Sequence, residues 1–167
     1  MVTNMMKKSV FLTCLVLCVV LMASCVKRLK EIRVVSEKPG HTLLIAGNSS
    51  AFKDKVRQRI IEKYKQTCTI HVVNVKALDE RLAADYDVVL IMDTCVAWSV
   101  SSNTLKTFMD REQNRQKTVF AMTAGKSDWS YSYKGVDAIT SASRVENEEV
   151  FFNRIDTGIE RILAKAE

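Results

Sequence analysis

The stretch that decides the fold is Thr42-Leu-Leu-Ile-Ala-Gly47, an uninterrupted apolar run that ends at a glycine. A short apolar run bounded by a turn residue is typical of a strand buried on both faces of a sheet. After it, apolar residues recur at helical spacing up to about residue 66, namely Phe52, Val56, Ile60, Ile61 and Tyr64. The stretch 42–66 therefore predicts a strand, a loop and a helix in succession.

The same alternation continues along the chain. Further strands are predicted at 69–75, 87–92, 117–122 and 136–143, and further helices around 78–83, from about 102, and over 150–163. Strands that alternate with helices form right-handed crossovers and a parallel sheet covered on both faces. The longest apolar strands come first, third and fourth. We therefore predict a three-layer, doubly wound α/β domain over residues 41–167, with five parallel strands in the order 2-1-3-4-5.

The N-terminal segment predicts where the protein works. Lys7-Lys8 precedes an uncharged apolar run over 9–22, and Ala23-Ser24-Cys25 follows. A charged start, an apolar middle and small residues before a cleavage point form the pattern of an export signal. The cysteine after the small residues resembles the bacterial lipoprotein signal. This resemblance implies removal of residues 1–24, a lipid on Cys25 that holds the chain to the membrane, and a charged tether over 25–40. The domain would then lie outside the cytoplasm, on the cell membrane or the outer membrane.

An uncleaved membrane anchor is the alternative. The charge-free window 9–26 is 18 residues long, at the short end of the roughly 17–25 residues that span a bilayer. The basic residues after it would then hold the domain in the cytoplasm, namely Lys27, Arg28, Lys30 and Arg33. A simple anchor has no need for the Ala-Ser-Cys ending, so we favour lipidation.

Charge and cysteine content narrow the function classes. The chain has 167 residues and a formal net charge of +6. Much of the excess positive charge lies in the tether, where basic side chains attract anionic lipid headgroups. The domain after the tether contains no basic stripe interleaved with aromatic residues, so no nucleic-acid partner is expected. Cys68 and Cys95 form no C-x-x-C motif, and His41 and His71 are isolated. No metal site is expected either.

Three loops are predicted at the carboxyl ends of the strands, where sheets of this type bind ligands. The loop 47–53 supplies backbone N–H groups and small hydroxyl side chains ahead of a helix, which is the chemistry of a phosphate site. Loops 93–101 and 123–135 contain both tryptophans of the chain and two tyrosines. The aromatic rings of these residues can stack on a flat aromatic ligand.

On these loops the domain resembles the flavodoxin family. Gly47-Asn-Ser-Ser-Ala-Phe-Lys53 falls where flavodoxins carry a Ser/Thr-x-Thr-Gly-x-Thr phosphate loop. Asn48 takes the place of the first hydroxyl residue, Ser50 keeps the second, Ala51 replaces the glycine and Lys53 the last threonine. Lys53 would offset a phosphate charge, unless it is only a solvated residue of the first helical turn.

The other two loops extend the resemblance. Asp93-Thr-Cys-Val-Ala-Trp-Ser99 and Thr123-Ala-Gly-Lys-Ser-Asp-Trp-Ser-Tyr131 fall where the family places its flavin-flanking loops. The resemblance implies FMN as cofactor and electron transfer to an unknown redox partner protein at the cell envelope, with no catalytic side chain. The cofactor-binding residues it implies are Asn48, Ser49, Ser50, Lys53, Thr94, Cys95, Trp98, Thr123, Gly125, Trp129 and Tyr131.

Other functions stay open. The aromatic residues can simply cover the sheet, which would leave a non-catalytic binding module that kept the fold after losing the flavin. A hydrolase or transferase that uses the loop serines lacks a Gly-x-Ser-x-Gly elbow and a histidine in these loops. Asp137-Ala-Ile-Thr-Ser-Ala-Ser143 resembles the sequence at which FMN-binding domains of membrane electron-transport complexes attach FMN covalently. Because this segment is predicted as the fifth strand, we do not expect Ser143 to carry FMN.

Overall fold

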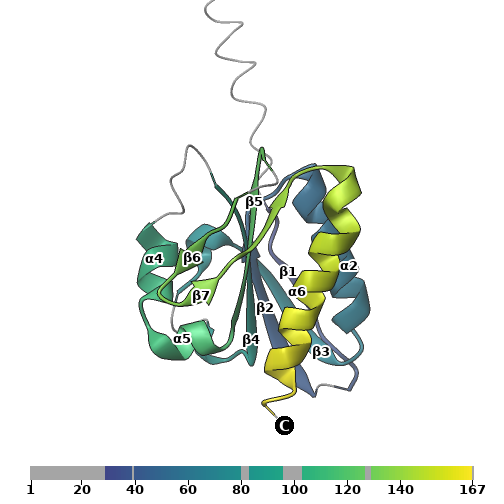
Figure 1. The fold of residues 1–167 in the computed structure, drawn as a ribbon. Coiled ribbons are helices and arrows are strands. Elements are labelled where there is room, and N and C mark those ends of the chain that lie inside the picture. The colour runs from purple at the N-terminus through teal and green to yellow at the C-terminus, as the bar shows by residue number, and fades with distance from the viewer. Residues whose placement is uncertain (1–28, 39, 80–82, 96–102, 127–128, 167) are drawn as a thin grey trace, which may run out of the picture.

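A computed structural model describes residues 29–38, 40–79, 83–95, 103–126 and 129–166. It shows an α/β fold in which a mostly parallel six-stranded sheet is flanked by helices (Figure 1). The strands are β1 (Ile32–Val34), β2 (His41–Gly47), β3 (Cys68–Asn74), β4 (Val88–Thr94), β5 (Thr118–Ala124), β6 (Ser132–Tyr133), β7 (Val136–Asp137) and β8 (Ile139–Ala142). The helices are α2 (Ala51–Tyr64), α4 (Asn103–Met109), α5 (Glu112–Gln116) and α6 (Glu148–Leu163), with 3₁₀ turns η1 (Val75–Ala77) and η2 (Val145–Asn147).

The sheet has the order β1-β3-β2-β4-β5-β8, with β1 antiparallel to β3 and the other neighbours parallel. The predicted five-stranded, wholly parallel sheet of order 2-1-3-4-5 is therefore corrected to a mixed, six-stranded one. The added strand comes from the segment predicted as a tether. Its Ile32 and Val34 lie opposite Val72 and Ile70 of β3, where β-branched side chains fit a pleated edge.

The predicted fifth strand over 136–143 is also corrected, because the chain divides it between two sheets. Val136–Asp137 forms β7 and pairs with β6 in a separate hairpin, and only Ile139–Ala142 joins the main sheet as β8. The hairpin turns through Lys134 and Gly135, whose φ angles are 48° and 82°. Such a turn requires left-handed backbone conformations, which glycine adopts at little cost.

The helix predicted around 78–83 is described only in part: Leu78 and Asp79 are not helical, whereas Ala83 and Ala84 are, and the 3₁₀ turn η1 ends just before this stretch at Ala77. Residues 80–82 lie outside the described part of the chain, as do residues 1–28 with the predicted signal and Cys25. Among the residues that are described, no helix is long and apolar enough to cross a membrane.

Two apolar cores sandwich the sheet. Figure 1 shows α2 and α6 on one face and α4 and α5 on the other. Leu43 and Ile45 of β2 face α2 and α6, whereas the alternate residues Leu44 and Ala46 face the side of α4. All four are fully buried, as the continuous apolar run predicts. β2 also packs so closely on β4 that a Cβ at Gly47 would lie 2.5 Å from the carbonyl oxygen of Met92.

Helix α6 is fixed against α2 by ion pairs between the two helices. Lys63 Nζ lies 2.6 Å from Asp156 Oδ2, and Lys55 Nζ lies 2.8 Å from Glu148 Oε2. The hydrogen bond from Lys55 is the main cause that lowers the pKa of Glu148. The acidic side of α6 therefore faces α2.

Candidate functional site

The loop between β2 and α2 lies at the predicted site, but its hydroxyl groups already have partners. Ser50 is the N-cap of α2, and its side chain accepts a hydrogen bond from Lys53 N at 3.3 Å. Ser49 Oγ donates to Asp54 Oδ2 at 2.6 Å. A cap of this kind satisfies a backbone N–H that would otherwise be free for a ligand. The two serines therefore fix the start of the helix.

Lys53 and Asp93 are buried at the same end of the sheet. Lys53 is 1% exposed, and its Nζ donates to Thr94 Oγ1 at 2.6 Å. Asp93 Oδ1 accepts hydrogen bonds from Asn48 Nδ2 at 2.6 Å and from Thr94 N at 2.8 Å. Burial lowers the pKa of the Lys53 ammonium below its ordinary value, and the Asp93 carboxylate opposes this shift. Lys53 is thus a core residue and not a solvated one.

Arg57 completes this network from the next turn of α2. It is 4% exposed, and its guanidinium donates to Asp54 Oδ1 at 2.6 Å and to the carbonyl oxygen of Asn48 at 2.8 Å. Arg57 Nε is buried and has no hydrogen-bond partner in the described structure. Two cations, Lys53 and Arg57, stand beside two carboxylates, Asp54 and Asp93. We refer to these four side chains with Asn48, Ser49 and Thr94 as the switch-point network.

Three further predicted residues lie close to this network. Thr123 Oγ1 is 3.5 Å from Thr94 Oγ1, and Cys95 N donates to the carbonyl oxygen of Thr123 at 2.8 Å. Cys95 is a half-buried free thiol. Gly125 is exposed, and a Cβ there would meet no other atom within 4 Å. Trp98 lies outside the described residues.

The predicted aromatic residues pack on the core under the α4 side of the sheet. The Tyr131 ring meets Phe120 of β5 edge to face, with centroids 5.7 Å apart. Trp129 also packs on this core, its carbonyl oxygen accepts a hydrogen bond from Thr140 Oγ1, and its Nε1 is buried without a partner in the described residues. Tyr133 donates to Asp110 Oδ1 at 2.9 Å. Tyr131 and Tyr133 thus cover the sheet.

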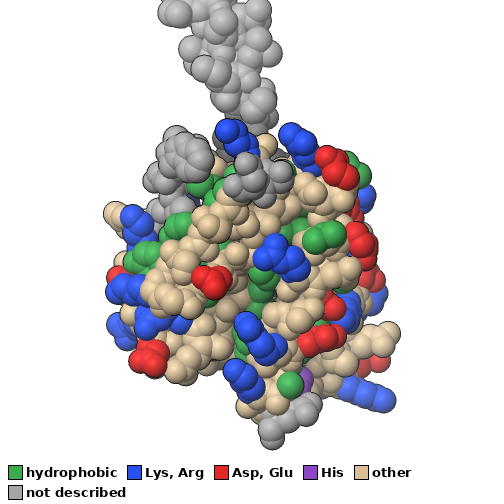
Figure 2. Space-filling view, viewed as in Figure 1, with side chains coloured by type: hydrophobic (Ala, Val, Ile, Leu, Met, Phe, Trp, Pro, Cys, Tyr) green, Lys and Arg blue, Asp and Glu red, His purple; other side chains and the backbone are tan. Residues whose placement is uncertain are grey.

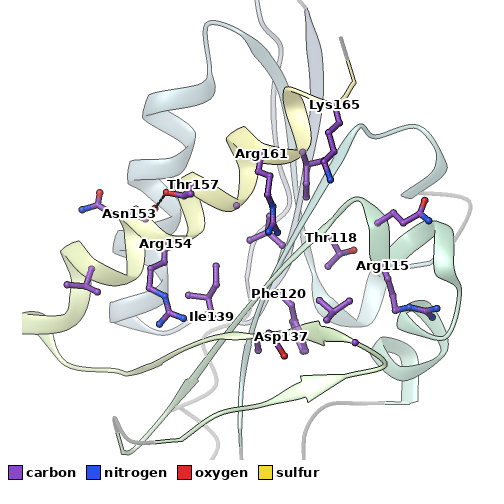
Figure 3. A pocket seen from close by; sticks show the side chains of 18 residues that line it. Arg115, Thr118, Phe120, Asp137, Ile139, Asn153, Arg154, Thr157, Arg161 and Lys165 are labelled. Atoms are coloured by element: carbon purple, nitrogen blue, oxygen red, sulfur yellow. Dashed lines mark hydrogen bonds between the residues drawn. The ribbon is translucent and has the colours of Figure 1, made fainter.

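A second candidate site lies at the other end of β5, where the sequence predicts none. A cavity of about 840 Å³ opens between α6, α5 and the start of β5 (Figure 3). Its lining includes four cationic side chains and one carboxylate, namely Arg115, Arg154, Arg161, Lys165 and Asp137. We refer to this cavity as the β5-edge groove. The signal for it is charge patterning, because positions 154 and 161 share one side of α6 and residue 165 follows the end of that helix.

Comparison with known proteins adds no family assignment. No protein-family model matches the chain, and no curated protein is detectably similar to it in sequence. In the part of the chain that is described, no group of three or more His, Cys, Asp or Glu residues is placed to hold a metal ion.

The switch-point network predicts an unequal effect of two lysine substitutions, one in α2 and one at the residue that follows α2. Lys53→Met should lower the free energy of unfolding by about 3 kcal/mol, because it removes a buried cation that interacts electrostatically with the buried Asp93 carboxylate. Lys65→Met is the matched control. Lys65 is paired with Glu62 at the surface, where such a pair contributes about 1 kcal/mol or less. Urea unfolding followed by circular dichroism measures both, and equal losses would contradict the buried network.

Proposed function

We propose that this protein is a non-catalytic binding module on a flavodoxin-like core, tethered to the membrane outside the cytoplasm by a lipid on Cys25. The observation that carries the proposal is the self-pairing of the switch-point network. Lys53 is 1% exposed, and Ser49 and Ser50 already bond Asp54 and the helix backbone. The two cations and two carboxylates balance, so no positive charge is left over for a phosphate dianion.

The flavodoxin-like part of the proposal is supported by strand order. Without the antiparallel edge strand β1, the remaining strands lie in the order β3-β2-β4-β5-β8. Numbered along the chain from β2, these five parallel strands follow the order 2-1-3-4-5 that flavodoxin-like folds share. A hydrolase based on the loop serines finds no support, because both hydroxyls are engaged and neither faces a histidine in the described loops.

An FMN-dependent electron carrier is the second candidate. It is favoured by the placement of Thr94 at the carboxyl end of β4, and of Cys95 and Gly125 just beyond β4 and β5, where such folds bind their cofactor. For FMN to bind there, Ser49 or Ser50 would have to release its present partner. The Lys53 ammonium would also have to leave Thr94.

FMN titration separates the two candidates. Added to the full chain, FMN should keep its fluorescence, because the Ser49 and Ser50 hydroxyls and the Lys53 ammonium already have partners and Tyr131 is packed against Phe120. Riboflavin, which lacks the phosphate, is the matched ligand and should behave in the same way. Saturable quenching of FMN fluorescence, without quenching of riboflavin fluorescence, would show a phosphate site. The flavin carrier would then be the better proposal than the binding module.

Membrane attachment has its own test. In a bacterial host, labelled palmitate should be incorporated into the full chain and lost in Cys25→Ser, because the acyl chain requires this thiol. Cys18→Ser is the matched control, since its cysteine would leave with the signal segment, and it should keep the label. Undiminished labelling of the Cys25→Ser variant would contradict the proposed anchor.

A further inference from the structure

The β5-edge groove contains an unpaired stretch of sheet edge. β8 pairs with β5 from Ala121 to Ala124 only, whereas β5 begins at Thr118. Within the described structure, residues 118–120 have no strand beside them on this side. The cause is the departure of Val136–Asp137 to the hairpin with β6. A strand that would otherwise have covered this edge is therefore missing.

The backbone of this stretch faces the groove at alternate residues. Ala124 O accepts a hydrogen bond from Ser143 N on the side of β8, and Thr123 O accepts one from Cys95 N on the side of β4. Successive residues of a strand direct their backbone groups to opposite neighbours. By this alternation, the backbone groups of Thr118 and Phe120 are directed to the same side as those of Ala124, into the groove.

Helix α6 forms one wall of the groove and lies close to β5. A Cβ at Gly158 would lie 3.1 Å from Val119 Cγ1, so the glycine permits this close approach. In Figure 3, Arg154 and Arg161 extend from α6 toward the edge of β5, and Arg115 lies on the opposite side, next to α5. Cations thus stand on both sides of the unpaired edge, whose residues Thr118, Val119 and Phe120 are buried.

The cations that line the groove differ from those of α2 in having no acidic partner among the described residues. Arg154 donates to the carbonyl oxygen of Thr140 and Arg115 to those of Met109 and Asp110. Arg161 and Lys165 make no side-chain hydrogen bond or ion pair with the described residues. By contrast, the α2 cations are paired with acidic residues of α6 in the bonds Lys55–Glu148, Arg59–Glu149 and Lys63–Asp156.

The charges of α6 are therefore sorted by side. Its acidic residues meet α2, and its basic residues line the groove. Figure 2 shows Lys and Arg side chains down the middle of this face, whereas acidic side chains gather along the side where α2 and α6 meet. The one carboxylate that lines the groove is Asp137. An occupant that complements this surface is anionic.

We propose that the β5-edge groove binds an extended acidic segment of a partner protein, which adds a strand alongside Thr118–Phe120. This inference rests on the proposed binding function and names its partner. Strand addition satisfies the backbone groups of an exposed edge, and pockets for alternate side chains give it specificity. Every second side chain of the added strand would face α6, where Arg154, Arg161 and Lys165 lie. The segment is therefore acidic at alternate positions.

Selection from a phage-displayed library of random dodecapeptides on the full chain in detergent tests this assignment. Enriched peptides should carry Asp or Glu at alternate positions. For a synthetic enriched peptide, the double variant Arg161→Glu/Lys165→Glu should weaken binding about tenfold or more, because two attractive contacts become repulsive. The matched variant Lys38→Glu/Lys76→Glu carries the same charge change at exposed positions elsewhere and should alter affinity less than about twofold at physiological salt.

Hydrogen exchange tests the strand addition itself. The peptide should slow exchange of the Thr118 and Phe120 amides. Acidic peptides that bind without this protection would overturn strand addition, and displacement by a single-stranded oligonucleotide of equal charge would assign the groove to nucleic acid. If enriched peptides bind the Arg161→Glu/Lys165→Glu variant with unchanged affinity, the groove is not their binding site, but the proposed binding function still holds. Failure to enrich any peptide would count against both.

Discussion

The structure depends on the neutralisation of buried charge at the carboxyl ends of β2 and β4. Lys53 and Asp93 are 1% and 5% exposed, and neither would be stable there alone, because an unpaired buried charge costs several kcal/mol. Their partners join three separate segments, since Asn48 follows β2, Thr94 ends β4 and Lys53 lies in the first turn of α2. The same bonds that orient α2 on the sheet engage the Ser49 and Ser50 hydroxyls and the Lys53 ammonium, three groups that could otherwise contact a phosphate.

A second constraint shapes the opposite end of β5. The hairpin of β6 and β7 takes Val136 and Asp137 out of the main sheet, and the edge of β5 is left open beside the basic side of α6. Exposed edges invite pairing with another chain, and proteins commonly protect them with charged side chains. Arg161 and Lys165 line the cavity beside this edge, and in the proposed assignment they would select an acidic partner. This arrangement fits a module that binds a partner through its sheet and not through a cofactor.

Much of the fold could be predicted from the sequence, because the runs at β2 and β4 are apolar throughout and exclude most other structures. β1 and the β6–β7 hairpin could not be predicted, since strands of two or three residues have no measurable periodicity and depend on their partners. The burial of Lys53 could not be predicted either, because its partner Thr94 lies 41 residues away in sequence. The groove could not be predicted, because its cations come from α5 and from the region of α6, which only folding brings together.

A double-mutant cycle between Lys53→Met and Asp93→Asn tests the central claim most directly. If the two charges neutralise each other in a closed network, removing the second should cost less once the first is gone. The loss of unfolding free energy in the double variant should then be smaller than the sum of the two single losses by about 1 kcal/mol or more. Strictly additive losses would show that the two charges do not act together, and would contradict a self-paired switch point.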